Sequence, residues 1–288
     1  MGKVDKAVRE SRRMIEAESF KEQHRTSKKK FSRIRKLTFS RMIILIMQKS
    51  VKSIQLILNE WFEWLGEQTV SNSAFTQARA NLKHTAFIAL NERIVEIYYE
   101  DGVYQRYKGF RLLAIDGSKI RLPEGEGLKE AFGGIRYSHQ KAEVNGEHNY
   151  AQVSVLFDVL NRILITGECG KARAYEVDLA IKHLSYAQPC EDLWLCDRNY
   201  ATAHFMATLI GQKLNFVIRC PARFAVAKQM LTGQGADNRI VTLKVGQEES
   251  LCVRLVRVKL TTGEYEVLAT SLWPESRYPT DFFKEIYH

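Results

Sequence analysis

The sequence predicts a mixed α/β domain preceded by an all-helical region. Up to about residue 108 the apolar residues recur mostly three and four positions apart, the period of amphipathic helices. From Gly109 onward short apolar runs and alternating stretches, both typical of strands, replace that period. A length of 288 residues with 45% hydrophobic and 10% aromatic residues is enough to bury substantial cores. These features exclude an intrinsically disordered, collagen-like or disulfide-stapled small protein.

Positive charge is concentrated at the amino terminus. The chain has 43 Lys and Arg against 33 Asp and Glu, a net charge of +10, and residues 1–40 alone carry +8 of it. Such an excess favours a polyanionic partner, either nucleic acid or an anionic membrane surface. The longest apolar run, Met42 to Met47, is far shorter than the roughly 20 residues of a membrane-spanning helix. The first residues are too polar for a signal peptide, so we expect a cytoplasmic protein with no membrane partner.

The cysteines indicate neither a disulfide framework nor a zinc ribbon. Their number, five, is odd, and no CxxC or similar ligand spacing occurs. We interpret them as reduced, mostly buried thiols.

Residues 1–38 form the first predicted region, a basic arm. Its densest part can neutralise several phosphates with salt-dependent affinity that is blind to sequence. A basic tail that is merely solvated accounts for the same composition. The residues concerned are Lys28, Lys29, Lys30, Arg33, Arg35 and Lys36.

Residues 39–108 form the second predicted region, which is helical. One helical stretch covers 39–65 with a break near 50–53, and another starts at Ser71 or Ser73 and continues to Tyr98. The short polar connections suit a helix-turn-helix arrangement, and a plain helical bundle explains them equally well. Trp61 and Trp64, three positions apart, are assigned to the core.

Residues 109–288 form the third predicted region, and two of its strands each end at an acidic residue. Leu112 to Ile115 is a short buried strand followed by Asp116, and Leu193 to Cys196 is another followed by Asp197. Between them, after a loose glycine-rich stretch, 150–159 and 163–168 should form an antiparallel hairpin. The remaining predicted elements are helices at 175–186 and 201–211, a strand at 214–218, an antiparallel β section at 240–271, and a helix beginning near Thr280 or Asp281.

The order strand, strand, strand, helix, strand, helix, strand resembles the core of a ribonuclease-H-like fold. In that fold the first and fourth strands are neighbours, so Asp116 and Asp197 should converge. Paired carboxylates at the edge of a sheet suit Mg²⁺ or Mn²⁺. Two such ions would support an in-line attack on a phosphodiester. Asp-Gly and Asp-Arg-Asn are also ordinary turn formers after strands, and this reading accounts for the same spacing.

Four local motifs together resemble bacterial insertion-sequence transposases of the DDE class, the IS-four family. The segment Ser73 to Arg79 also resembles the helical DNA-binding segment before their catalytic core, and the resemblance spans about residues 35–288. The four motifs, in the family's order, are Leu112 to Ser118, Gln152 to Asn161, Leu193 to Tyr200 and Phe216 to Arg219.

The resemblance implies a site and a function. It makes Asp116 and Asp197 the first two acids of a catalytic triad that holds two Mg²⁺ or Mn²⁺ ions, within a ribonuclease-H-like domain that carries a β insertion at about 222–272. It implies DNA strand cleavage and transfer at the terminal repeats of a mobile element. It also implies a protein that associates with the nucleoid when it binds DNA, and it leaves open whether the protein forms a homo-oligomer on DNA. Residues matching family contacts with DNA are Arg79, Arg198, Tyr200, Arg219 and Tyr287. For Arg198, Tyr200 and Arg219, surface or packing roles are equally open.

Departures from the family pattern concern the turn after Asp197 and the third acid. Asn199 stands where the family usually has glycine, and asparagine tolerates a left-handed backbone. Tyr287 matches the family's tyrosine, but Glu285 is out of register for the catalytic glutamate, so no third acid is assigned within the chain. We therefore interpret the sequence as truncated before that glutamate. A catalytically inactive DNA-binding protein, or an inhibitor of an intact transposase, is the alternative function.

Glu176 and His183 lie seven positions apart, so they share one face of the helix predicted at 175–186. The family often has an acid and a histidine here. We favour a place on the helix surface or in the core over contact with a metal.

Overall fold

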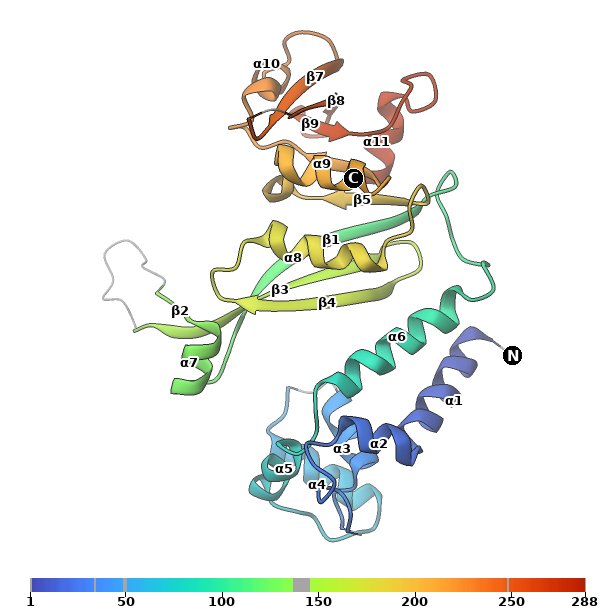
Figure 1. Ribbon diagram of the computed structural model, residues 1–288, viewed down its shortest axis with the longest axis vertical. Coiled ribbons are helices and arrows are strands. Elements are labelled where there is room, and N and C mark those ends of the chain that lie inside the picture. The colour runs from blue at the N-terminus through green and yellow to red at the C-terminus, as the bar shows by residue number, and fades with distance from the viewer. Residues whose placement is uncertain (1, 34, 49–50, 137–145, 248, 288) are drawn as a thin grey trace. The chain divides into compact units, whose positions relative to one another are not determined.

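The computed structural model describes residues 2–33, 35–48, 51–136, 146–247 and 249–287. The chain forms two compact units, residues 1–103 and 104–288. The first holds the helices that precede the change of period near Gly109, and the second holds every strand assigned in the described residues (Figure 1).

The first unit is helical throughout, including most of the segment predicted as a basic arm. In that segment, α1 and α2 pack against α6 and bury Ile15 and Phe20. The predicted break between two helices is present, and Thr38, Ser53 and Ser71 cap the helices that follow them. The helices are α1 (Lys3–Glu16), α2 (Glu18–His24), α3 (Phe39–Met47), α4 (Ile54–Trp64), α5 (Asn72–Arg79) and α6 (Thr85–Tyr99).

Two hydrophobic clusters hold this unit together. One joins α1, α2, α3 and α6, and the other joins α3, α4 and α5 around the fully buried Phe62. Trp61 packs partly against the second cluster, as expected. The prediction for Trp64 is wrong, because this side chain is 78% exposed, although its ring lies 5.8 Å from that of Trp61.

The second unit is built on one mixed sheet. Its central strand β1 pairs antiparallel with β3 and parallel with β5, and β5 pairs parallel with β6. The hairpin predicted at 150–168 is present as β3 and β4, and the predicted neighbours, the first and fourth strands, are β1 and β5. The strands named here are β1 (Arg111–Arg121), β3 (His148–Asp158), β4 (Ile163–Lys171), β5 (Asp192–Cys196) and β6 (Asn215–Arg219).

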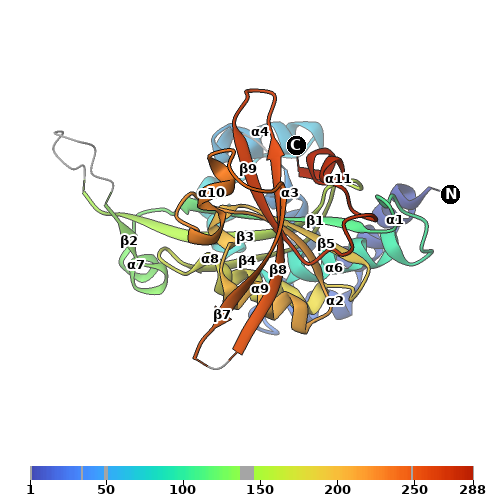
Figure 2. The ribbon, with the colours of Figure 1, turned by 90° about the horizontal axis from the view of Figure 1, so that it is seen from above.

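The predicted β insertion extends this same sheet. Its last strand, β9 (Tyr265–Thr270), pairs antiparallel with β6, and β8 (Glu249–Lys259) and β7 (Asn238–Val245) continue from it. The Thr270 hydroxyl donates to the Phe216 carbonyl at 2.7 Å and helps fix this junction. The strand order β4-β3-β1-β5-β6 is consistent with a ribonuclease-H-like core, with β9 added at one side (Figure 2).

Helices cover both faces of the sheet. Trp194 of β5 meets Phe205 of α9 (Ala203–Gly211) on one face, where α8 (Glu176–Lys182) also lies. The adjacent Leu193 points the other way, into a cluster with Phe282 of α11 (Thr280–Tyr287). Figures 1 and 2 show α8 and α9 on the side of the sheet away from α11. Shorter elements are α7 (Glu126–Phe132) and β2 (Gly134–Ile135), within the stretch expected to be loose, and α10 (Lys228–Leu231).

All five cysteines are free, as predicted, but the expectation that most are buried is wrong. Cys169, Cys190 and Cys252 are exposed, and only Cys196 and Cys220 are buried. In the described segments, none of the helices combines the length and apolar character needed to cross a bilayer.

Candidate active site

The structure brings the middle of β1 beside the end of β5. The prediction that the first strand ends before Asp116 is wrong, because pairing with β3 continues β1 to Arg121. Ile115 pairs with Cys196 at the last position of their parallel register. The residues that follow, Asp116 within β1 and Asp197 just after β5, therefore lie beside each other, where neighbouring strands are about 4.8 Å apart. The backbone thus confirms the prediction, made from the strand order, that positions 116 and 197 lie next to each other on neighbouring strands.

The two acids also occupy positions on the same face of the sheet. Side chains alternate along a strand, so residues an even number apart face the same way. Leu112 and Leu193 both contribute to the cluster that contains α11, and each acid lies four residues beyond one of them. The strand geometry therefore places Asp116 and Asp197 on the α11 face.

Charge around this pair is not compensated by an ion pair. Asp116 is exposed, and its Oδ1 accepts a hydrogen bond from the Gly117 amide at 2.8 Å. No basic side chain in the described residues forms a salt bridge with either carboxylate. Close like charges of this kind favour binding of a cation.

The donor set fits a hard divalent ion in part. Two carboxylates on adjacent strands are oxygen ligands of the type that Mg²⁺ and Mn²⁺ accept, with solvent or substrate oxygens completing the shell. In the segments that the structure describes, no group of three or more His, Cys, Asp or Glu is arranged to hold a metal. Asp116 and Asp197 would thus be the residues that hold such an ion.

Two further predicted residues lie next to the acids. Arg219 follows Ile218, which pairs with Cys196, so Arg219 leaves β6 beside Asp197. Its side chain is 40% exposed and forms an ion pair with Glu266 of β9. The Tyr287 hydroxyl donates to the Cys196 carbonyl at 2.8 Å, and burial raises the pKa of this tyrosine. The end of α11 is therefore fixed beside the last residue of β5.

The turn after Asp197 contains one exposed and one buried candidate. Arg198 is exposed, whereas Tyr200 is only 1% exposed and packs against Phe205 at 5.8 Å between ring centroids. Burial raises the pKa of the Tyr200 hydroxyl. Tyr200 therefore packs in the core under the turn that follows Asp197. Contact with DNA through Tyr200 or Tyr287 stays a prediction.

Glu285 does not join the acids. Its Oε2 accepts a hydrogen bond from the hydroxyl of Tyr107, and this contact together with burial raises the pKa of Tyr107 to about 12. Glu285 is thus held by a residue that precedes β1. This position agrees with the prediction that Glu285, which is out of register for the catalytic glutamate, is not the third acid.

Glu176 contacts the site, which sequence reasoning did not foresee. Its Oε2 accepts from Asn199 Nδ2 and its Oε1 from Gln152 Nε2, both at 3.3 Å. The single helix predicted at 175–186 is divided, since α8 ends at Lys182 and His183 begins a 3-10 helix. The seven-residue spacing also could not show what either side chain contacts. His183 is fully buried and hydrogen-bonds Ser154 at 3.0 Å, so it has the core role that the sequence favoured.

A second candidate surface lies in the first unit. The predicted basic loop is folded, because Arg25 donates to the Lys30 carbonyl at 3.0 Å and Phe31 packs edge-on against Phe39. Together with α5 it forms a groove of about 810 Å³. The predicted residues that line the groove are Lys29, Lys30, Arg33, Arg35 and Lys36. Lys28 and Arg79 are exposed but are not among the lining residues.

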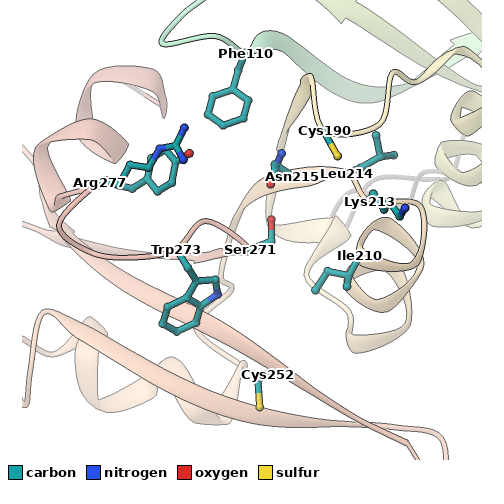
Figure 3. A pocket seen from close by; sticks show the side chains of 11 residues that line it. Phe110, Cys190, Ile210, Lys213, Leu214, Asn215, Cys252, Ser271, Trp273 and Arg277 are labelled. Atoms are coloured by element: carbon teal, nitrogen blue, oxygen red, sulfur yellow. The ribbon is translucent and has the colours of Figure 1, made fainter.

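Another pocket lies at the opposite edge of the sheet. It has a volume of about 520 Å³ and is lined by Cys190, which precedes β5, and by Asn215, which begins β6. Lys213, Trp273 and Arg277 also line it (Figure 3). Because these strands begin where the pocket lies and end at the acids, the pocket is separate from the carboxylate pair.

Comparison with protein families gives one match. Residues 107–288 match the family described as the transposase DDE domain. No curated protein shows significant similarity to the chain. The matched region starts four residues before β1 and includes the whole sheet and both acids.

Proposed function

The chain belongs to the transposase DDE domain family, and from this premise we propose that it is a transposase of the IS-four type. It binds double-stranded DNA at the ends of an insertion sequence and, when its catalytic site is complete, carries out metal-dependent strand cleavage and transfer. The observation that carries this proposal is the convergence of Asp116 in β1 and Asp197 after β5 on one face of the sheet, without a salt-bridge partner in the described residues.

In this proposal Asp116 and Asp197 would supply carboxylate ligands to Mg²⁺ or Mn²⁺, as two of the three acids of a two-ion site. Such ions, when bound, activate the attacking hydroxyl group and stabilise the leaving oxygen of a phosphodiester. The protein orients the two carboxylates through the β1 and β5 register and holds the end of α11 beside them through Tyr287. Arg198 and Arg219, at the ends of adjacent strands, bind phosphates of the DNA backbone.

The groove in the first unit provides the main DNA contact of the proposed protein. Five lysine and arginine side chains line it, and the small side chains of Ala74 and Ala78 on α5 leave it open. Contacts of this type bind the backbone and weaken steeply as salt rises. The proposal therefore assigns end binding to this unit and strand chemistry to the sheet.

Strand cleavage tests this function directly. Duplexes carrying the repeats that flank the protein's own coding sequence should be nicked in Mg²⁺ or Mn²⁺ by the unchanged protein. The Asp116→Ala variant, which retains the groove, should give no product above background. Equal product from both proteins would reject the acid pair as the site.

A second candidate is a DNA-binding protein without catalytic activity, or an inhibitor of an intact transposase. The location of the groove favours it, because the basic residues lie in a unit that contains neither acid. A gel-shift assay in about 100 mM salt should show binding by both the unchanged protein and the Asp116→Ala variant. Binding without cleavage by the unchanged protein supports this candidate, and absence of binding rejects both.

A further inference from the structure

The carboxylate of Glu176 bridges two amide side chains beside the acid pair. One amide belongs to Asn199, two residues after Asp197, and the other to Gln152 on β3. Gln152 pairs with Lys119, three residues after Asp116 on β1. Through one side chain, α8 is therefore connected to the segments that follow both acids.

Gly117 makes this bridge sterically possible. A Cβ at this position would lie 3.0 Å from Gln152 Nε2 and 3.3 Å from the Glu176 carboxyl carbon, closer than most real side-chain contacts. The missing side chain lets Glu176 and Gln152 pack directly against the backbone next to Asp116. Glycine is commonly used where another group must approach the backbone this closely.

We propose that Glu176 is a positioning residue that fixes the spacing of Asp116 and Asp197 by hydrogen-bonding Asn199, in the turn after β5, and Gln152 on β3, the strand paired with β1. This inference rests on the proposed function, because it concerns the affinity of the acid pair for a divalent cation. Residues that orient metal ligands typically change metal affinity or activity by about 10–100-fold when they are removed.

The geometry separates this role from that of a third metal ligand. Ser154 and Gln152 lie on the face covered by α8, and Gly117, opposite Ser154, shares that face. The acids lie on the other face, four residues beyond Leu112 and Leu193, which face α11. Both oxygens of Glu176 already accept hydrogen bonds from amides. No three-carboxylate group suited to a metal occurs among the described residues.

Substitutions of Glu176 separate the hydrogen bonds from the charge. Glu176→Ala removes both. Glu176→Gln removes the charge but can keep both hydrogen bonds, because the Gln152 amide can reverse and present its oxygen to the introduced amide nitrogen. Asp178→Ala is the matched control, since Asp178 is an exposed acid on the same helix turn.

The readout is Mn²⁺ affinity, followed by electron paramagnetic resonance of the free ion, with thermal unfolding measured on the same samples. Relative to the unchanged protein, Glu176→Ala should bind Mn²⁺ about 10–100-fold more weakly. Glu176→Gln and Asp178→Ala should keep most of the affinity. Asn199→Ala, which removes one of the hydrogen bonds from the other end, should also weaken binding and serves if Glu176→Ala does not fold.

Three results would overturn the inference, and they are distinguishable. Unchanged affinity in Glu176→Ala, or in Asn199→Ala if the former does not fold, removes the positioning role while leaving the acid pair intact. Equal loss in Glu176→Gln and Glu176→Ala assigns the effect to charge and not to hydrogen bonding. If the unchanged protein binds Mn²⁺ no better than Asp116→Ala, the proposed metal site itself fails, and the inference fails with it.

Discussion

The stretch over which β1 and β5 pair has an ion pair at one end and two like charges at the other. At the start of β1 and β5, Arg111 pairs in register with Asp192, and two hydrogen bonds of 2.7 and 2.9 Å join them with 2% and 0% of their side chains exposed. At the other end of the stretch over which these strands pair, Asp116 in β1 and Asp197 after β5 lie side by side, and no described basic side chain forms a salt bridge with either. One end holds a compensated pair, and the other holds two like charges.

This difference separates a structural role from a binding role. Buried charges are tolerated only when a partner and hydrogen bonds replace water, and Asp192 has both, since the Gln188 amide also donates to it at 2.7 Å. Two unmatched carboxylates contribute nothing comparable to folding, and their repulsion falls when a cation binds. Changes to Arg111 or Asp192 should therefore lower mainly stability, whereas changes to Asp116 or Asp197 should lower mainly metal binding.

The largest expected loss of stability comes from Arg111→Met. It leaves the Asp192 carboxylate buried without its cation, which typically costs about 3–5 kcal/mol of unfolding free energy. Urea denaturation of the full chain measures the change. The double variant Arg111→Met/Asp192→Asn, in which neither partner is charged, should recover most of it. If the double variant is as unstable as the single one, the loss is due to packing and not to the unpaired charge.

Lowering the pH should give the next largest loss, through His183. Burial, with the charge of Lys182 adding to it, lowers the pKa of His183 to about 4, below its unfolded value of about 6.5. Between these values the unfolded chain binds more protons, so this contribution is complete above pH 6.5 and is lost as the pH falls toward 4. The shift corresponds to about 3 kcal/mol.

The variant His183→Gln isolates this contribution. Its stability relative to the unchanged protein should improve steadily between pH 7 and pH 4.5, because glutamine does not titrate. Denaturation curves at both pH values measure the difference. A constant gap between the two proteins would mean that His183 is not the titrating group.

A smaller effect is expected for Gly117→Ala. The added Cβ meets the far ends of two flexible side chains, Gln152 and Glu176, which can move aside. We expect a loss of about 1 kcal/mol, at the low end for overpacking. The Mn²⁺ affinity of Gly117→Ala should be lower than that of the unchanged protein, as expected for Glu176→Ala, since both changes disturb the same hydrogen bonds. Normal Mn²⁺ affinity in this variant would show that the bridge tolerates displacement.

The acid pair could be predicted from sequence because it depends only on strand order and on the side-chain period of two. The Glu176 bridge could not, since it depends on how α8 packs across β3 and on which amides then meet its carboxylate. Arg111 and Asp192 gave no signal either, because charged residues that flank apolar runs usually mark strand ends at the surface. Contacts between side chains far apart in the sequence require a register that periodicity alone does not provide.

The smallest change in stability is expected for Asp116→Asn, and it is the most informative about the comparison. The carboxylate is exposed and has no described salt bridge, so removing its charge should leave unfolding unchanged or make it slightly less favourable. Mn²⁺ should then stabilise the unchanged protein against urea but not the variant, because the proposed site needs both native carboxylates to bind the ion. If Asp116→Asn markedly lowers stability in the absence of metal, then folding depends on Asp116 as it does on Asp192.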